Sequence, residues 1–240
     1  MTVSRPRLLK LSGEALGGTD GIFDPLALTR VCSEVVAGSG PGTTALGIVV
    51  GGGNIIRGNT LKRGAIDPTR GDYMGMLGTL INSLALKDGI ERQGGRAEIM
   101  APHAIPNVAQ LYDRARALAW LAEGVVLIFG GGTGHPFFTT DTAAALRAAE
   151  IGAGELLKGS KVDGVYSADP KLDPHARRFS TLTFQQALDG RYGVMDLAAF
   201  ELCKERGISI RVFDMTAAGS ITAALGSHPP GTLIGPHPGP

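Results

Sequence analysis

The chain has 240 residues, a length that fits one large α/β domain or two small ones. Hydrophobic residues make up 43% and charged residues 19%, a globular balance that excludes intrinsic disorder and fibrous repeats. The net charge of +1 excludes a general attraction to nucleic acid or anionic lipid, so any anion must be bound by local features.

Short apolar runs rich in Leu, Val and Ile alternate along the chain with helix-like segments. The runs have the length of buried strands and lie at residues 7–11, 44–50, 97–101, 125–129, 155–157 and 208–213. The helix-like segments lie at residues 25–37, 72–93, 108–122, 141–151, 184–188, 197–206 and 217–225. Strands that alternate with helices predict an α/β fold in which helices cover both faces of a mainly parallel sheet.

Local signals refine two of these helices and the end of the chain. Asp24 is predicted to cap the helix 25–37, which Pro25 opens. Four apolar residues of the helix 72–93 share the spacing of one buried stripe: Leu77, Leu80, Ile81 and Leu84. Prolines around residues 232–234 predict a last edge strand there, followed by a loose tail at about 236–240. With no clear linker, residues 1–240 are expected to form a single domain.

Glycine is about twice as frequent as usual, with 36 residues in the chain. Three clusters, at residues 13–21, 51–58 and 130–134, lie close to the ends of apolar runs. Ligands of parallel α/β folds bind beyond the carboxyl ends of the strands. The clusters are therefore candidate binding loops.

The first cluster follows a strand that ends at Lys10, after which the chain turns through Ser12 and Gly13. Glycine lets backbone amides approach phosphate oxygens, and Lys10 adds a positive charge beside them. A solvated lysine before an ordinary turn is the commoner explanation of such a short motif on its own. In the second cluster, consecutive glycines 51–53 form a candidate anion site with Arg57, and a tight strand-to-helix turn is an equal alternative.

The third cluster joins glycines to hydroxyls, aromatics and an aspartate: Thr133, Gly134, His135, Pro136, Phe137, Phe138, Thr139, Thr140 and Asp141. Plain helix capping by the hydroxyls and a turn role for His135 are the alternatives, but two aromatics favour a pocket wall. A fourth stretch, 156–170, places two lysines, a tyrosine and an aspartate near a glycine-rich turn: Lys158, Lys161, Tyr166 and Asp169. It is equally compatible with a hairpin turn at 163–164 and a second turn at 169–170.

Several familiar motifs are missing from the sequence. It contains no G-x-x-x-x-G-K-[ST] phosphate loop, no G-x-G-x-x-G dinucleotide motif and no G-x-S-x-G nucleophile elbow. Several phosphate-sized glycine loops with cations between them remain. Two facing anion sites suit transfer between two phosphorylated molecules.

In combination, these segments resemble the bacterial-type UMP kinases (uridylate kinases) of the amino-acid kinase superfamily. The resemblance covers residues 7–234 in the family's order and spacing. It is carried by KLSGEAL (10–16), GGGNIIRG (51–58), GDYMGMLGT (71–79), TGHPFFTTD (133–141), KVDGVYSADP (161–170) and VMDLAAFELC (194–203).

The resemblance implies a three-layer α/β/α sandwich, a homohexamer, and direct in-line transfer of the γ-phosphate of ATP, with Mg²⁺, to UMP in pyrimidine nucleotide biosynthesis. It implies ATP contacts by Lys10, Leu11, Ser12, Gly13, Gly53, Arg57, Ser160, Tyr166 and Asp169. It implies UMP contacts by Gly52, Asp72 and residues 133–140. The catalytic set is Lys10, Arg57, Asp141, Lys158 and Lys161, in which Asp141 orients a lysine rather than acting as a base.

Asp72 and two departures from the family pattern bear on the acceptor site. If Asp72 only opened a helix, it would be the N-cap of that helix. Beside UMP, its carboxylate would instead bind the ribose hydroxyls. His135 stands where the family usually has Asn, which puts the contacts there in doubt. The turn 17–24 resembles the segment linked to GTP activation but is about a residue shorter, which leaves activation by GTP and inhibition by UTP open.

Cys32 and Cys203 lie far apart without metal spacing and are expected to be reduced and buried. No apolar run approaches the ~20 residues that span a bilayer, so we expect a cytoplasmic protein without membrane or nucleic-acid partners.

Two rival functions stay open. One is an acetylglutamate-type kinase, which Asp72 and the 133–140 loop disfavour; the other is a non-catalytic nucleotide binder, which Lys10, Arg57 and Asp141 disfavour.

Overall fold

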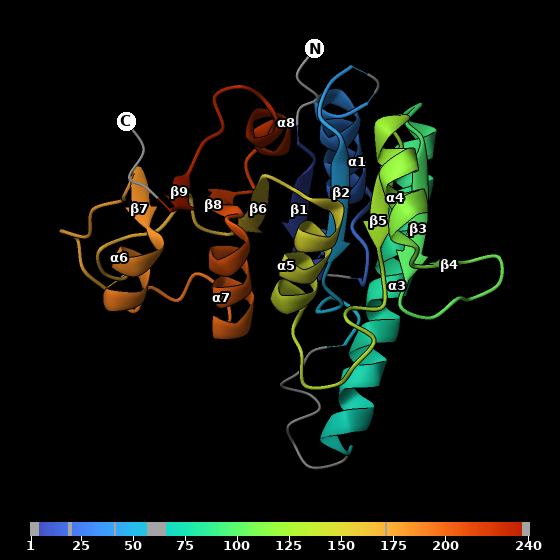
Figure 1. Cartoon of the computed structure of the whole chain (residues 1–240), viewed down its shortest axis with the longest axis horizontal. Helices are drawn as coiled ribbons and strands as arrows, with labels where there is room; N and C mark the ends of the chain where they lie inside the picture. Colours follow the sequence, from blue (N-terminus) through green and yellow to red (C-terminus); the bar gives the residue numbers. More distant parts are fainter. Residues whose placement is uncertain (1–4, 19–20, 41, 57–65, 171, 237–240) are drawn as a thin grey trace.

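The computed structural model of the chain describes residues 5–18, 21–40, 42–56, 66–170 and 172–236. Within them one nine-stranded sheet has the order β4-β3-β5-β2-β1-β6-β8-β9-β7 (Figure 1). The strands are β1 (Arg7–Leu11), β2 (Leu46–Val50), β3 (Ala97–Ala101), β4 (Gln110–Leu111), β5 (Val126–Phe129), β6 (Glu155–Ser160), β7 (Thr181–Thr183), β8 (Ser209–Asp214) and β9 (Thr232–Gly235). All neighbours pair in parallel except β8 and β9, which confirms the predicted mainly parallel sheet.

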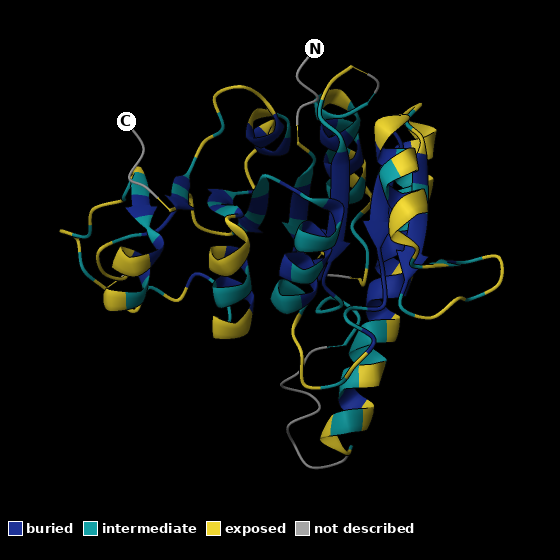
Figure 2. Ribbon diagram, viewed as in Figure 1, coloured by how far each residue is buried: buried dark blue, intermediate teal, exposed yellow. Residues whose placement is uncertain are grey.

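Helices cover both faces of the sheet and complete the predicted α/β/α sandwich. One face packs against α1 (Pro25–Gly38), α3 (Pro68–Arg92) and α8 (Ser220–Leu225). The other packs against α4 (Arg114–Ala122), α5 (Thr140–Ile151), α6 (Phe184–Asp189) and α7 (Leu197–Arg206). Successive strand residues point to opposite faces, so Leu8 joins one core and Leu9 the other. The buried strands and exposed outer helix surfaces are visible in Figure 2.

The start of the first helix is as predicted, but that of the next differs. Asp24 caps α1, because its Oδ1 accepts hydrogen bonds from the amides of Leu26 and Ala27 at 2.9 and 3.4 Å. The predicted start of the following helix at residue 72 is wrong. Helix α3 begins at Pro68, and its N-cap is Asp67, whose Oδ1 accepts from the Arg70 amide at 3.2 Å. Asp72 lies inside the helix, so the N-cap explanation of this residue is also wrong.

The predicted buried stripe of α3 is wrong as well. Leu77 is 57% exposed, and Ile81 and Leu84 are 46% and 42% exposed, whereas Leu80 alone of the four is buried. The buried face of α3 instead carries small and polar residues, among them Gly78, Thr79, Asn82 and Ser83. The apolar spacing identified a helix but not the face that packs on the sheet.

Further details of the fold differ from the sequence-based expectation. The predicted helix 108–122 begins only at α4, where Asp113 accepts from the Arg116 amide at 2.8 Å, and the short strand β4 precedes it. The predicted helix at 217 begins at Ser220. Strand β9 is not the sheet edge, because β7 pairs beyond it; three residues are too few for a strand to show periodicity. Of the predicted loose tail, residues 237–240 lie outside the described residues.

Both cysteines are free and buried, as predicted. Burial raises the pKa of the Cys32 thiol and of the Cys203 thiol to about 12, with smaller contributions from nearby carboxylates. Neither thiol is therefore ionised at neutral pH. Among the described residues, none of the helices has the length and apolar character needed to cross a bilayer.

A buried carboxylate fastens α8 to α1. Glu34 is 7% exposed and accepts hydrogen bonds from the amides of Gly219 and Ile221 at 2.9 and 2.8 Å and from Arg30 at 3.0 Å. We expect Glu34→Ala to lower the free energy of unfolding by about 2–3 kcal/mol, because it leaves these donors without their acceptor. Urea denaturation measures the loss. The control is Glu201→Ala, whose partner Lys204 is exposed, with an expected loss near zero; equal losses in the two variants would contradict the prediction.

Candidate functional site

The three predicted glycine loops all lie at the carboxyl ends of neighbouring strands. Gly13 follows β1, Gly51–53 follow β2, and Gly130–134 follow β5. The first two loops touch so closely that a Cβ on Gly13 would lie 2.4 Å from the Gly51 carbonyl oxygen and 2.9 Å from the Gly53 nitrogen. Only glycine fits there. In the third loop, Gly131, Gly132 and Gly134 have positive φ, which side chains rarely adopt.

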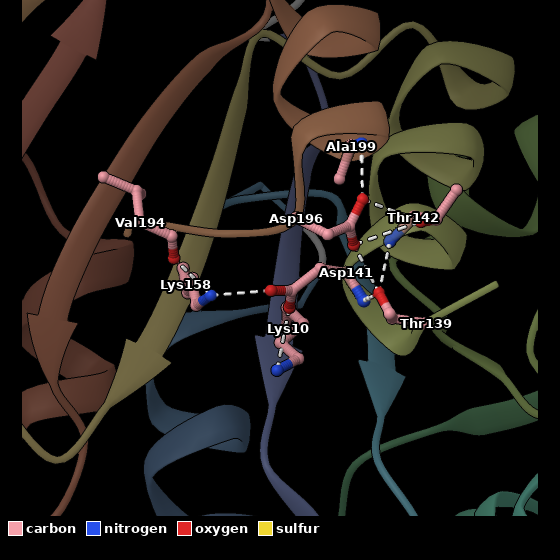
Figure 3. A network of polar contacts seen from close by, with 8 residues as sticks. All are labelled: Lys10, Thr139, Asp141, Thr142, Lys158, Val194, Asp196 and Ala199. Atoms are coloured by element: carbon pink, nitrogen blue, oxygen red, sulfur yellow. Dashed lines mark hydrogen bonds and ion pairs between the residues drawn. The ribbon is translucent and has the colours of Figure 1, made fainter. Parts of the chain in front are cut away.

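Two lysines and an aspartate form the charged centre of this edge of the sheet (Figure 3). Lys10 in β1 and Lys158 in β6 are register partners, so both side chains leave the same face of the sheet. Asp141, in the first turn of α5, lies between them. Its Oδ1 is 2.9 Å from Lys10 Nζ and its Oδ2 is 2.6 Å from Lys158 Nζ. Each side chain is only 12–16% exposed, so the alternative of a solvated Lys10 is wrong.

Burial and charge set the ionisation of this cluster. Burial by itself would raise the pKa of Asp141, but the charges and hydrogen bonds of Lys10 and Lys158 outweigh it and lower that pKa. Burial lowers the pKa of Lys158, and the charge of Asp141 opposes this only in part. Asp141 is therefore an ionised anchor between two cations, not a group poised to accept a proton at neutral pH.

Asp196, which residue-by-residue reasoning missed, holds the start of α5 in place (Figure 3). Its carboxylate accepts hydrogen bonds from the hydroxyls of Thr139 and Thr142 and, at 2.8 Å, from the Ala199 amide at the start of α7. Thr139 in turn caps α5, accepting from the Asp141 amide at 3.0 Å. The capping explanation of Thr139 is thus confirmed. An aspartate before an apolar helix was the available signal for Asp196.

Of the two cavities that adjoin the charged cluster, the larger has a volume of about 610 Å³. It contains the predicted ATP residues Ser160, Tyr166 and Asp169, together with Lys158. The segment 190–194, which the sequence reasoning did not select, forms another wall. Lys158 Nζ donates a hydrogen bond to the carbonyl of Val194 in that wall. The cavity therefore has its cationic end at the Lys10–Asp141–Lys158 cluster.

A smaller cavity of about 190 Å³ is lined by glycines of the second and third loops. Six predicted UMP residues line it: Gly52, Asp72, His135, Phe138, Thr139 and Thr140. Gly53, predicted to face ATP, also lines it, as do α3 residues that were not predicted, such as Met76 and Thr79. Thr140 immediately precedes Asp141, and Lys158 lines the larger cavity, so the charged cluster adjoins both cavities.

The remaining residues of the third loop do not line the smaller cavity. Phe137 is 75% exposed with φ of 72°, and its amide donates to Asp72 Oδ2 at 2.8 Å. Thr133 Oγ1 accepts from the His135 amide at 3.2 Å, so His135 also takes part in a turn. Gly134 lines a separate apolar cavity against α3. Of the two aromatics, only Phe138 belongs to the cavity wall.

Other predicted residues lie elsewhere. Lys161 is 66% exposed and pairs with Glu14 at 2.6 Å beside a third cavity that residues 17, 18 and 21 also line. Residues 163–164 do not form a hairpin, whereas a turn follows Asp169, whose carbonyl accepts from the Asp173 amide at 2.8 Å. Arg57 lies outside the described residues. Leu11 and Ser12 end β1 and begin the turn to Gly13.

The described residues contain no group of three or more His, Cys, Asp or Glu side chains that could hold a metal ion. Asp141 is already engaged by both lysines. A divalent ion that enters with a phosphorylated ligand fits this arrangement better than a resident ion, because Mg²⁺ commonly keeps phosphate oxygens and water as ligands. Two cavities that adjoin one cationic cluster suit transfer of a charged group between two anionic molecules.

Comparison with known proteins agrees with this geometry. The model of the amino acid kinase family matches residues 6–214. Uridylate kinase of Marinobacter nauticus is 48% identical over 228 residues, which cover 95% of this chain and 94% of that protein. Uridylate kinase of Bradyrhizobium diazoefficiens is 48% identical over 234 residues, which cover 97% of this chain and 98% of that protein. The crystal structure of UMP kinase from Ureaplasma parvum superposes with a TM-score of 0.91 at 31% identity, covering 98% of this chain and 100% of that one.

Proposed function

This chain belongs to the amino acid kinase family, and we propose that it is a UMP kinase that transfers the γ-phosphate of ATP to UMP, giving ADP and UDP. The observation that carries the proposal is a pair of cavities beside the Lys10–Asp141–Lys158 cluster: Lys158 lines the larger one, and Thr140, next to Asp141, lines the smaller one. The full-length uridylate kinase relatives identify the acceptor. A role in pyrimidine nucleotide biosynthesis follows from the reaction.

ATP is assigned to the larger cavity. Ser160, Tyr166 and Asp169 would hold adenosine, and the phosphates would extend toward Lys158 and Lys10. Ser12, Gly13 and Gly53 would offer backbone amides to the phosphates, with Arg57 and Lys161 as further cations. Lys161 would have to leave Glu14 to reach them.

UMP is assigned to the smaller cavity. Asp72 would accept hydrogen bonds from the ribose hydroxyls in place of the Phe137 amide, which now occupies its Oδ2. Gly52, Thr139 and Thr140 would surround the UMP phosphate. His135, Phe138 and the remaining residues of 133–140 would contact the nucleoside.

The transfer would be a direct in-line attack by a UMP phosphate oxygen on the γ-phosphorus, with ADP as the leaving group. Catalysis of this kind depends on positioning and on cations aimed at the charge that spreads over the transferred group. Lys10 and Lys158 supply those cations, and Asp141 fixes their positions. UMP needs no general base, because its phosphate is largely ionised at neutral pH. Mg²⁺ bound to ATP would neutralise phosphate charge.

An acceptor panel tests the proposal. Purified protein with ATP and Mg²⁺ is expected to release ADP at least ten times faster with UMP than with CMP, AMP, GMP, acetylglutamate or aspartate. The smaller cavity, lined by Asp72 and Phe138, would suit a nucleoside better than a small carboxylate, and the uridylate kinase relatives support uridine over the other bases. Omitting Mg²⁺ and adding GTP or UTP to the same assay test the metal and the effectors. The absence of UMP-dependent ADP release would refute the function.

Three further features belong to the proposal. We propose that residues 1–240 form one domain, which the single nine-stranded sheet of the described residues supports. We also propose a homohexamer, supported by the exposed apolar side chains of α3, Leu77, Ile81 and Leu84. Monomeric sedimentation would contradict it. We also propose a cytoplasmic location, which cell fractionation would test.

A further inference from the structure

Asn82 is a fully buried polar residue of α3 whose side-chain amide is directed at the loop after β2. Its Nδ2 donates to the carbonyl of Gly51 at 2.6 Å and to Oδ1 of Asn54 at 2.7 Å. Its Oδ1 accepts from Nδ2 of Asn54 at 3.0 Å. Both donors and the acceptor of this amide are therefore used within one loop, none of them to support α3 itself.

Asn54 extends the same contact to two other segments. Its Nδ2 also donates to the carbonyl of Ile22 at 2.9 Å, in the segment that precedes α1. Its Oδ1 lies 2.5 Å from the position of a Cβ on Gly13, so it packs against the first glycine loop. The two asparagines thus tie together α3, both glycine loops and the Ile22 segment.

The bond from Asn82 to the Gly51 carbonyl has a direct consequence for the neighbouring amide. The carbonyl of Gly51 and the N–H of Gly52 belong to one planar trans peptide unit, so they point in opposite directions. Because Asn82 draws the carbonyl toward α3, the N–H of Gly52 is turned away from Asn82. Gly52 lines the smaller cavity. The side chain of Asn82 therefore sets the direction of an amide at the cavity that would receive the acceptor phosphate.

We propose that Asn82, supported by Asn54, is a positioning residue for phosphoryl transfer: it orients the Gly51–Gly52 peptide so that the loop amides face the phosphate groups. The inference rests on the proposed function. A glycine loop on its own has many accessible backbone conformations. A pair of buried side-chain amides fixes one of them before substrate binds, which is how preorganised donors contribute to catalysis.

The experiment compares kcat per folded enzyme in the full chain. Asn82→Ala and Asn54→Ala are each expected to lower kcat at least 30-fold, while the dissociation constants of ATP and UMP change less than three-fold. Because the two residues act as one unit, the double variant should be no slower than the single variants. The control is Ser83→Ala, which removes the neighbouring buried hydroxyl. That hydroxyl donates to the Thr79 carbonyl of its own helix at 2.8 Å rather than to the loop after β2. We expect this variant to change kcat less than three-fold.

A merely structural role for Asn82 predicts a different outcome. The fraction of folded protein would fall, but kcat per folded molecule would stay within two-fold of that of the unaltered chain, and this result would overturn the inference. A double variant whose loss of kcat equals the product of the two single-variant losses would overturn the inference as well. If Asn82→Ala does not fold, Asn54→Ala, on the less buried partner, decides the question. Absence of UMP turnover in the unaltered chain would instead refute the proposed function and the inference together.

Discussion

Replacing Lys10 by alanine is expected to lower kcat for UMP phosphorylation about 100- to 1000-fold, the usual effect of removing one preorganised charge from a transition state. Lys10 lies one residue before the end of β1, beside the first glycine loop, and its side chain is only 12% exposed. Its ammonium lies 2.9 Å from Asp141, which follows Thr140 of the smaller cavity's wall. A contact that strengthens as charge develops on the transferred group affects kcat more than KM.

The fold should survive the same substitution. Asp141 keeps its 2.6 Å ion pair with Lys158 when Lys10 is absent, so no carboxylate is left buried without a partner. The matched control is Lys204→Ala, which removes a lysine that pairs with Glu201 on the exposed surface of α7. Steady-state kinetics and circular dichroism of the two variants complete the test. An unchanged kcat in Lys10→Ala would remove Lys10 from the mechanism.

The strands and the glycine loops were predictable because their signals are local. A short Leu-rich run such as Arg7–Leu11 is typical of a buried strand, and the structure begins and ends β1 at those residues. Glycines that follow such runs must lie at the carboxyl edge of a parallel sheet. The location of the site followed from these two facts.

The contacts within the site were not predictable from single residues, because they depend on which distant segments meet. Nothing near Lys10 indicates that Lys158 is its register partner in the adjacent strand, or that Asp141 lies between them. The resemblance to a family placed these residues together, and the structure supplied their geometry. Asn82 gave no signal at all, since its role arises only when α3 packs on the loop after β2.

The error in α3 has a related cause. The apolar spacing of Leu77, Ile81 and Leu84 would bury these residues in an isolated amphipathic helix that packs on its own core. In this fold the opposite side of α3 approaches the glycine loop closely: a Cβ on Gly52 would lie 2.7 Å from the Gly75 carbonyl oxygen. Small residues and amides are needed for that approach, so the apolar stripe is left outside.

Asp141→Asn is expected to lower kcat about 100-fold and to move the alkaline limb of the kcat–pH profile to lower pH. Burial already lowers the pKa of Lys158, and the negative charge of Asp141 opposes that effect. Removing the charge lets the pKa of Lys158 fall further, so the ammonium loses its proton at lower pH. Initial rates between pH 6 and 10, at saturating ATP and UMP, measure the shift. A limb at the same pH in both proteins would show that Lys158 is not the group that titrates.

The same substitution should also change how the free energy of unfolding depends on pH in the acid range. The two lysines lower the pKa of Asp141 below its unfolded value, so ionised Asp141 stabilises the fold above the ordinary carboxyl range and this contribution is lost as pH falls through the folded pKa. Asparagine cannot titrate, so the variant should be less stable by about 3 kcal/mol at pH 7, because two buried cations lose their counterion. The difference should narrow toward pH 3, as urea denaturation at both pH values would measure. If the free energies of unfolding of the two proteins differed by the same amount at both pH values, the carboxylate charge would not hold the two lysines, and Asp141 would act through hydrogen bonding alone.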